Sequence, residues 1–205
     1  YRICTAIYED ASERKVEKRA LCPEAVEHIY SLKEKSAKME DVYENIRILQ
    51  PVIEDQAAVY PYLDGITADG QLRVYIKNPE NLLIELKKKN ELFFAVKKEK
   101  ICDFYESEEF QRIFGAQNAI NGKAVCPANI DMLYDNLMYA NGIYYCMDCE
   151  WVFDFPVPLQ YLEFRSLYYF YVKYQKLLAQ VWTLESFLGN FGIEKATLQL
   201  YLDME

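Results

Sequence analysis

The hydrophobic pattern of this 205-residue chain changes near Gly65, and this change constrains what the chain can fold into. Before Gly65, apolar residues alternate with polar ones, or follow one another in runs rich in β-branched and aromatic side chains, at residues 1–9, 15–21, 46–53 and 56–63. Such short runs, separated by turn residues, are typical of strands, and the first two should form a β-hairpin. The chain before Gly65 is therefore expected to be rich in strands.

After Gly65 the apolar residues mostly recur with helical spacing. The predicted helices cover residues 79–99, 107–114, 158–179, 182–189 and 193–203. The strand-rich part contains one further helix, because Pro23 suits the first position of a helix that runs to about residue 36. The predicted class is α+β, with a strand-rich part at residues 1–64 and a mostly helical part at residues 65–205.

One stretch of the helical part has the pattern of strands instead. Residues 124–126, 137–139 and 143–147 are short extended runs, and Asn141-Gly142 between the last two is a strong signal for a two-residue hairpin turn. We therefore expect a β-hairpin inside the helical part.

Polar residues stand at both ends of this hairpin. Asp131 and Asn136, five residues apart, precede it, whereas Asp148 and Glu150 follow its second strand. Enzymes of phosphoryl transfer use this order of residues to orient an acceptor hydroxyl and to hold Mg²⁺. Asp131 is the predicted catalytic acidic residue, which accepts or orients the hydroxyl proton. Asn136 and Asp148 are the predicted metal ligands, and Glu150 supports Asp148. The alternative is a structural hairpin, in which Asp and Asn bond only to their own backbone.

These motifs resemble those of the protein-kinase-like superfamily, most closely its aminoglycoside phosphotransferase and choline kinase branch. The metal motif of that branch commonly reads Asp-aromatic-Glu, much as Asp148-Cys149-Glu150 does here. The resemblance implies a two-lobed protein-kinase-like fold, with a reduced strand-rich N-lobe at residues 1–64 and a helical C-lobe at residues 65–205. It also implies a cleft for ATP and Mg²⁺, and transfer of the γ-phosphoryl group to a hydroxyl of a small molecule or sugar.

The same resemblance implies roles for residues of the N-terminal part. Lys18 stands where the family has its phosphate-contacting strand lysine. Glu24 looks like the helix glutamate that pairs with this lysine, with Glu27 as the alternative one helical turn away. Tyr60 and Tyr62 lie in a segment similar to the hinge between the lobes, whose backbone would meet adenine.

Two departures from the family pattern favour an alternative function. Asn129 stands where the catalytic loop usually has a histidine, and residues 1–64 contain no glycine, so the phosphate-covering glycine loop is either upstream or absent. Both are expected of a pseudokinase, a scaffold or regulatory module without activity. A further alternative is a hydrolase that uses two carboxylates from among Asp148, Glu150 and Asp154, about 5 to 9.5 Å apart.

Residues 150–158 resemble, more weakly, kinase-like modules in large bacterial enzymes of surface-polysaccharide synthesis, beside glycosyltransferase or methyltransferase domains. The chain also starts at Tyr1 inside a strand pattern and stops at Glu205 inside a helical one. We therefore expect a fragment of a longer multidomain protein, with its neighbouring domains as partners.

Composition excludes or disfavours several classes of partner and location. A formal net charge of −9 argues against nucleic acid as a partner, because affinity for nucleic acid comes largely from Lys and Arg. The sequence contains no run of about 18 apolar residues, so no membrane-spanning helix is predicted. The six cysteines lack the spacing of a disulfide scaffold, which fits a reducing cytoplasm. Cys146 and Cys149 are read as buried apolar residues rather than a zinc pair, since the only histidine is the distant His28.

Overall fold

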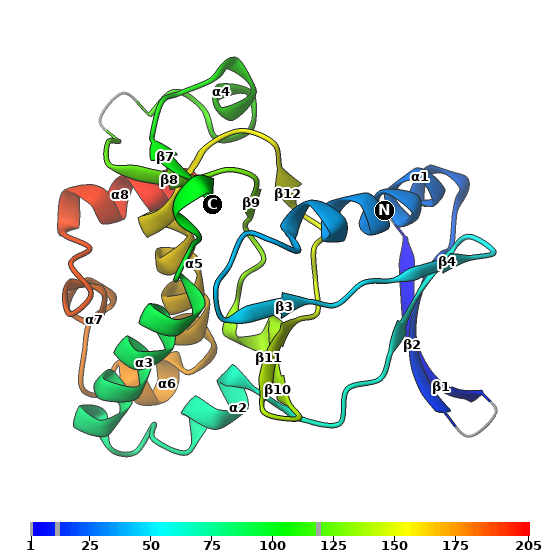
Figure 1. Cartoon of the computed structure of the whole chain (residues 1–205). Coiled ribbons are helices and arrows are strands. Elements are labelled where there is room, and N and C mark those ends of the chain that lie inside the picture. Colours follow the sequence, from blue (N-terminus) through cyan, green and yellow to red (C-terminus); the bar gives the residue numbers. More distant parts are fainter. Residues whose placement is uncertain (1, 11–12, 118–119) are drawn as a thin grey trace.

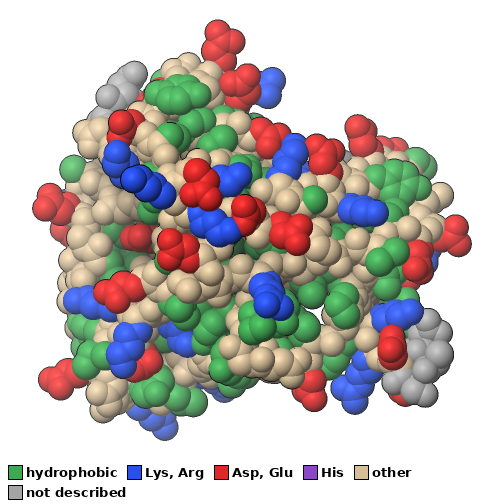
Figure 2. All heavy atoms as spheres, in the orientation of Figure 1, with side chains coloured by type: hydrophobic (Ala, Val, Ile, Leu, Met, Phe, Trp, Pro, Cys, Tyr) green, Lys and Arg blue, Asp and Glu red, His purple; other side chains and the backbone are tan. Residues whose placement is uncertain are grey.

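The structure is a computed structural model that describes residues 2–10, 13–117 and 120–205 (Figure 1). Strands dominate the N-terminal part and a central hairpin, and helices dominate the C-terminal part. The α+β class predicted from the sequence is therefore confirmed. Among the described helices, none has the length and apolar character needed to cross a membrane. Figure 2 shows acidic and basic side chains interspersed over the face in view.

An antiparallel sheet forms the N-terminal part. Its strand order is β1 (Ile3–Asp10), β2 (Glu13–Ala20), β5 (Ala57–Pro61) and β4 (Val52–Glu54). The expected β1–β2 hairpin is present, although Ala11 and Ser12 of its predicted turn lie outside the described residues.

Helix α1 (Pro23–Met39) covers one face of this sheet. It begins with a proline and has an acidic residue in its first turn, as the sequence indicates. Its buried residues recur every three or four positions, so they share one face of the helix. From that face Ile29 and Leu32 pack against Ala58 and Tyr60 of β5, and this small core holds helix and sheet together.

The single strand predicted at residues 46–53 is in fact two strands in different sheets. Strand β3 (Ile46–Ile48) runs parallel to β11 (Ile143–Cys146) of the central hairpin, whereas β4 pairs with β5. Pro51, which has no N–H for a sheet hydrogen bond, lies between them. The N-terminal part therefore contributes one strand to the C-terminal sheet.

The central hairpin forms as predicted. Strands β10 (Leu137–Ala140) and β11 are antiparallel, and β6 (Ile66–Thr67) pairs with the outer edge of β10. The turn residues Asn141 and Gly142 have φ values of 52° and 81°, as a two-residue turn with both residues in the left-handed region requires. At the other end of the hairpin, the N–H of Met147 donates to the carbonyl of Asn136 at 2.9 Å. This pairing brings Asn136 and Asp148 to the same end of the two strands.

Helices pack around a large aromatic core in the C-terminal part. They are α2 (Ala68–Arg73), α3 (Pro79–Phe93), α4 (Glu108–Phe114), α5 (Leu159–Lys173), α6 (Gln175–Leu178), α7 (Leu184–Gly189) and α8 (Lys195–Asp203). Phe93, Phe110, Tyr161, Phe164 and Phe187 are among the largest fully buried side chains.

Two predicted helices are shorter than expected. The helix predicted at residues 79–99 ends at Phe93, because Val96 forms a β-bridge with Tyr43 and the N–H of Lys97 bonds to the carbonyl of Val42. A short 3₁₀ turn, η1 (Lys98–Lys100), follows. The helix predicted at residues 158–179 is interrupted at Tyr174, which separates α5 from α6.

Short strands hold the loops beside the hairpin, and only the one predicted at residues 124–126 was expected from the sequence. A three-stranded sheet joins β13 (Val157–Pro158), β8 (Lys123–Val125) and β7 (Ile101–Asp103), and β9 (Ala128–Asn129) pairs with β12 (Val152–Phe153). The 3₁₀ turn η2 (Tyr134–Asn136) leads into β10. Since Asn129 stands opposite Val152, the loop that carries Asp131 lies beside the segment that carries Asp148 and Glu150.

Candidate functional site

A cavity of about 270 Å³ lies between the N-terminal sheet and the central hairpin. Five of the seven predicted site residues line it: Lys18, Tyr60, Tyr62, Asn136 and Asp148. The rest of its lining is apolar and comes from Ile7, Val16, Leu49, Pro61, Leu63, Met138 and Met147. The cavity is thus an apolar slot with charged and amide groups at one end.

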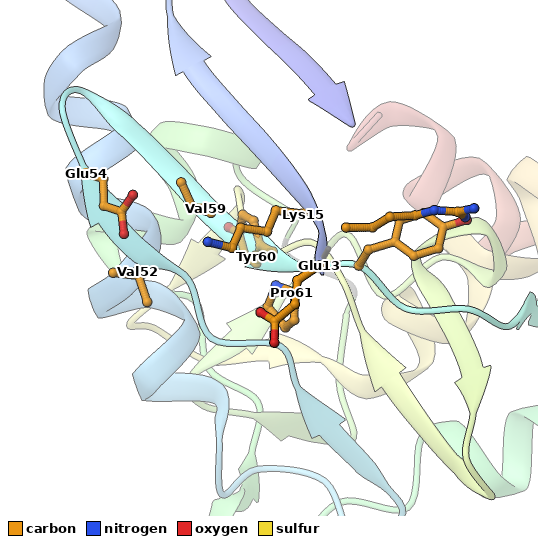
Figure 3. A pocket seen from close by; sticks show the side chains of 9 residues that line it. Glu13, Lys15, Val52, Glu54, Val59, Tyr60 and Pro61 are labelled. Atoms are coloured by element: carbon orange, nitrogen blue, oxygen red, sulfur yellow. The ribbon is translucent and has the colours of Figure 1, made fainter. Parts of the chain in front are cut away.

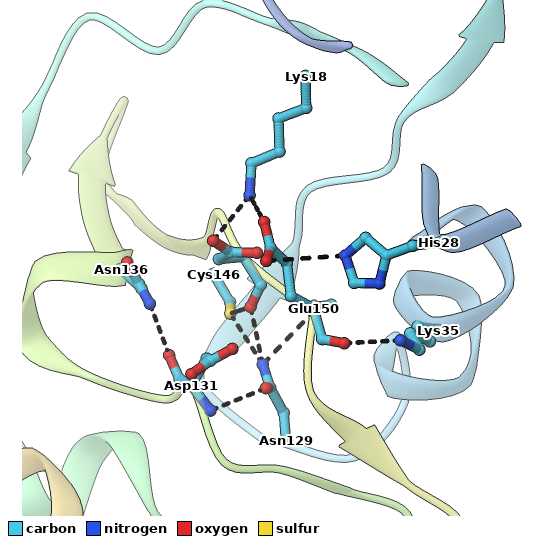
Figure 4. A network of polar contacts seen from close by, with 10 residues as sticks. Lys18, His28, Lys35, Asn129, Asp131, Asn136, Cys146 and Glu150 are labelled. Atoms are coloured by element: carbon cyan, nitrogen blue, oxygen red, sulfur yellow. Dashed lines mark hydrogen bonds and ion pairs between the residues drawn. The ribbon is translucent and has the colours of Figure 1, made fainter. Parts of the chain in front are cut away.

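Lys18 joins the two sides of this cleft (Figure 4). Its Nζ, on β2, donates to Asp148 Oδ2 at 2.8 Å and to Glu150 Oε1 at 2.6 Å. Burial opposes the charge of Lys18, but the two carboxylates more than offset this and raise its pKa above the usual value. These contacts span more than a hundred residues of sequence and depend on the packing of the N-terminal sheet against the hairpin.

Burial also acts against the charge of Asp148. Burial raises its pKa even though Lys18 acts in the opposite direction, and the charge of Glu150 adds to the rise. Its Oδ2 is bonded to Lys18, whereas Oδ1 is buried and has no hydrogen-bond partner within the described part of the chain. Buried polar atoms are nearly always paired, so this oxygen is an unusual feature of the site.

Asn129 braces the two loops that carry the acids. It is fully buried, its Nδ2 donates to the carbonyl of Asp148 at 2.8 Å, and its Oδ1 accepts from the N–H of Asp131 at 3.0 Å. The same Nδ2 lies 3.6 Å from the sulfur atoms of Cys146 and Cys149, which are themselves buried. Asn129 therefore links the two halves of the site directly.

Asp131 and Asn136 are also brought together. The Nδ2 of Asn136 donates to the carbonyl of Asp131 at 3.0 Å. Burial raises the pKa of Asp131 to about 6, and the negative charge of Asp148 adds to this effect. A carboxyl group with such a pKa can both accept and release a proton near neutral pH, as a general base requires. The predicted convergence of Lys18, Asp131, Asn136 and Asp148 is thus observed.

The structure corrects the predicted partner of Lys18. Glu24 is exposed in the first turn of α1, where hydrogen bonds to its own N–H and to Cys22 lower its pKa, and it does not reach Lys18. Glu27 is exposed as well. Because Ile29 and Leu32 fix the rotation of α1 on the sheet, the glutamates point away from the cleft, and Lys18 binds the carboxylates after β11 instead.

Helix α1 presents basic residues to the site instead. His28 Nε2 lies 3.7 Å from Glu150 Oε2, and Lys35 Nζ donates to the carbonyl of Glu150 at 2.6 Å (Figure 4). Burial lowers the pKa of both basic groups. Neither residue was predicted from the sequence to have a role. Their seven-residue spacing, beside the apolar face that includes Ile29 and Leu32, is the signal that could have found them.

Asp154, one of the carboxylates of the hydrolase alternative, lies outside this cluster. Its side chain is 67% exposed and forms an ion pair with Lys38 at 2.7 Å. The other two carboxylates of that alternative, Asp148 and Glu150, share the ammonium group of Lys18.

A larger cavity of about 560 Å³ lies on the other side of the N-terminal sheet (Figure 3). Its lining includes Glu13, Lys15, Val52 and Val59, but not the acids of the central hairpin. Of the predicted site residues only Tyr60 and Tyr62 border it, whereas Lys18, Asn136 and Asp148 line the smaller cleft.

Comparisons with known proteins leave the family open. No family model matches the chain, and no curated protein matches it. Among solved structures, it is similar to the apoenzyme of the macrolide 2′-phosphotransferase MphH from Brachybacterium faecium. That match covers 98% of this chain and 78% of the other, with 10% sequence identity and a TM-score of 0.45. A likeness at this TM-score carries no weight in the function proposed below.

Proposed function

We propose that this chain is a kinase-like phosphotransferase that uses ATP and Mg²⁺ and acts on a hydroxyl of a small molecule or sugar. One observation carries the proposal: the buried Asp148 bonds Lys18 with Oδ2, while its Oδ1 has no hydrogen-bond donor among the described residues. A buried carboxylate oxygen without a partner is costly, so it is expected to have one in the working protein. A divalent cation at the end of the cleft would satisfy it.

The residues present fit Mg²⁺. This ion prefers oxygen ligands and is commonly held by one or two carboxylates together with substrate phosphates. Asp148 Oδ1 would supply one oxygen, and the side-chain Oδ1 of Asn136 would supply another, since its Nδ2 is used to hold Asp131. A bound ion would supply positive charge against the phosphates of the nucleotide.

The cleft also suits a nucleotide. Its apolar walls match a flat base, with Val16 and Tyr60 on the sheet side and Met138 and Met147 on the hairpin side. The ammonium of Lys18 lies at the polar end, where phosphate oxygens would replace one of its carboxylate contacts.

Asp131 is the proposed general base. Its pKa of about 6 leaves it mostly ionised at pH 7 to 8, so that it can orient an acceptor hydroxyl and accept its proton. Asn129 and Asn136 hold its main chain on the two sides of the residue.

Residues 1–64 and 65–205 are the two lobes of this proposal, and the segment that contains Tyr60 and Tyr62 is the hinge between them. Strand β3 is the exception, because it belongs to the first lobe by sequence but pairs with β11 of the second. The six cysteines are free thiols, which suits the reducing cytoplasm that we propose as the place of action.

A pseudokinase is the second candidate, as a scaffold or regulatory module in a multidomain glycosyltransferase or methyltransferase of cell-surface polysaccharide synthesis. The observation that favours it is the double engagement of Lys18 by Asp148 and Glu150, which closes the site with the protein's own groups. The hairpin β1–β2 above the cleft also lies in a stretch without glycine, so it cannot form a glycine-rich phosphate cover.

Thermal unfolding with and without Mg²⁺-ATP tests both candidates. A ligand at about 100 times its Kd adds roughly 2.7 kcal/mol, which should raise the Tm of a chain of this size by roughly 5 to 10 °C. The shift should be lost in Lys18→Met and Asp148→Asn, and kept in Lys123→Met, which removes an exposed lysine paired with Asp103.

Release of ADP separates an enzyme from a scaffold. It should be measured with ATP alone, so that water is the acceptor, and with added sugars and amino alcohols. A Tm shift without ADP release in any mixture would favour the pseudokinase, and absence of both would refute a nucleotide site.

A further inference from the structure

The loop that carries Asp131 rests on helix α5. Arg165 Nη1 donates to the carbonyl of Ile130 at 3.0 Å, and Ser166 Oγ donates to the carbonyl of Met132. Two adjacent residues of one helix thus hold the main-chain carbonyls on both sides of Asp131. We propose that Arg165 and Ser166 are positioning residues, which set the direction of the Asp131 carboxylate toward the acceptor; this rests on the proposed function.

The support beneath the loop is rigid. Arg165 is 9% exposed and Ser166 is 1% exposed. They lie in a 15-residue helix, between Phe164 and Leu167, which are both fully buried in the main core. A catalytic group on a loop is placed accurately only when residues behind it are locked by packing and hydrogen bonds. Helix α5 supplies such a support here.

The contacts from α5 complete the restraint of Asp131. Asn129 binds its N–H and Asn136 binds its carbonyl, so these contacts fix the peptide groups on either side of its Cα. Arg165 holds the other end of the first of these peptide groups, at the carbonyl of Ile130, and Ser166 holds the carbonyl of Met132, one peptide group further along the chain. With the main chain held at four points, the direction of the Cα–Cβ bond of Asp131 is set by the protein before any substrate binds.

The guanidinium of Arg165 also contacts groups outside the loop. Its Nε lies 3.0 Å from Glu205 Oε1, and its Cζ lies over the ring of Tyr169, 5.4 Å from the ring centre. Glu205 in turn accepts hydrogen bonds from the hydroxyls of Tyr161, at 2.8 Å, and Tyr169, at 2.7 Å. The hydrogen bond of the guanidinium is the one that Nη1 donates to Ile130, because Nε makes none within the described residues. A buried charge is also costly unless it is paired, and the ion pair with Glu205 meets this need. It keeps Arg165 in one orientation beneath the loop.

Steady-state release of ADP from Mg²⁺-ATP, with water as acceptor, tests the inference. Arg165→Met and Ser166→Ala should each lower kcat, by up to about 100-fold for a displacement of about 1 Å, and leave the KM for ATP within about twofold of the wild type. Arg165→Lys, which keeps one charged donor for the carbonyl of Ile130, should recover part of the loss. The control is Tyr171→Phe, which removes a hydroxyl of the same helix that donates to the carbonyl of Trp182 at 2.8 Å.

Hydrogen exchange of the loop amides tests the inference without any need for enzymatic turnover. In Ser166→Ala, which removes one oxygen and leaves the helix intact, the amides of residues 130–133 should exchange faster while those of 137–146 do not change. Unchanged exchange would refute the inference, and so would KM rising in step with the fall of kcat. If the wild type releases no ADP, the proposed function fails, and the exchange rates alone decide whether α5 holds the loop.

Discussion

Glu163 gives a sharp prediction that does not depend on any proposed activity. It lies on α5 and faces a cavity of about 310 Å³ that is also lined by Asn90, Glu91 and Asn190. The side chain of Glu163 makes no hydrogen bond or ion pair with any other described residue. Burial alone raises its pKa from 4.5 to about 7. Between pH 4.5 and about pH 7, the folded protein therefore holds a proton at Glu163 that the unfolded chain has already released.

The size of the effect follows from this shift. A rise from 4.5 to about 7 is about 2.5 pKa units, and one unit is worth about 1.36 kcal/mol, so Glu163 costs the folded state about 3 kcal/mol when it is ionised. Below pH 4.5 both states are protonated and the cost vanishes. Between pH 4.5 and 7 the folded state binds more protons, so stability falls as pH rises, and above about pH 7 the cost is constant.

Urea unfolding of the wild type and of Glu163→Gln, from pH 4 to pH 9, measures this cost. The variant should be about 3 kcal/mol more stable than the wild type at pH 8, and nearly equal to it at pH 4. Glu80→Gln, an exposed position of α3, is the matched control and should show no such divergence. A stability difference that does not change with pH, or a variant that is less stable at pH 8, would refute the reasoning.

The other predictions concern packing and buried polar groups. A Cβ at Gly65 would overlap the carbonyl oxygen of Tyr139, so Gly65→Ala should lower the free energy of unfolding by about 1 to 3 kcal/mol. Gly142 has a φ of 81° but lies in open space, so Gly142→Ala should lower the free energy of unfolding by only about 1 kcal/mol. If urea unfolding shows the same loss for both variants, the predicted overlap at Gly65 is wrong. Tyr134→Phe removes the hydroxyl that donates to the buried Asn90 Oδ1 and should cost about 1 to 3 kcal/mol; an unchanged Tm would show that the amide finds another donor.

The features predicted correctly are the elements whose structure is determined by residues close together in the sequence. The β1–β2 hairpin follows from its alternation, α1 from its proline and its apolar face, and β10–β11 from Asn141-Gly142. The meeting of Lys18 with Asp148 is of another kind, because no local pattern links residues 130 positions apart. It was expected only through the resemblance to a known family.

The incorrect or missing predictions concern features that are determined by packing between distant parts of the chain. Whether residues 46–48 continue into β4 or join another sheet depends on the presence of β11, nearly a hundred residues later. Which side of α1 faces the cleft depends on how Ile29 and Leu32 seat on β5, and this turned Glu24 outward. Strands of two residues, such as β9 and β12, are too short to carry a period at all.

The parallel pairing of β3 with β11 has a consequence for any attempt to divide the chain. The backbone enters the C-terminal sheet at Ile46, returns to the N-terminal sheet at Val52, and leaves again after Pro61. A cut after Asp64 would take β3 away and leave β11, the strand that leads to Asp148, with one bare edge. The two regions that differ so clearly in hydrophobic pattern are thus interlaced, and neither is a separable folding unit.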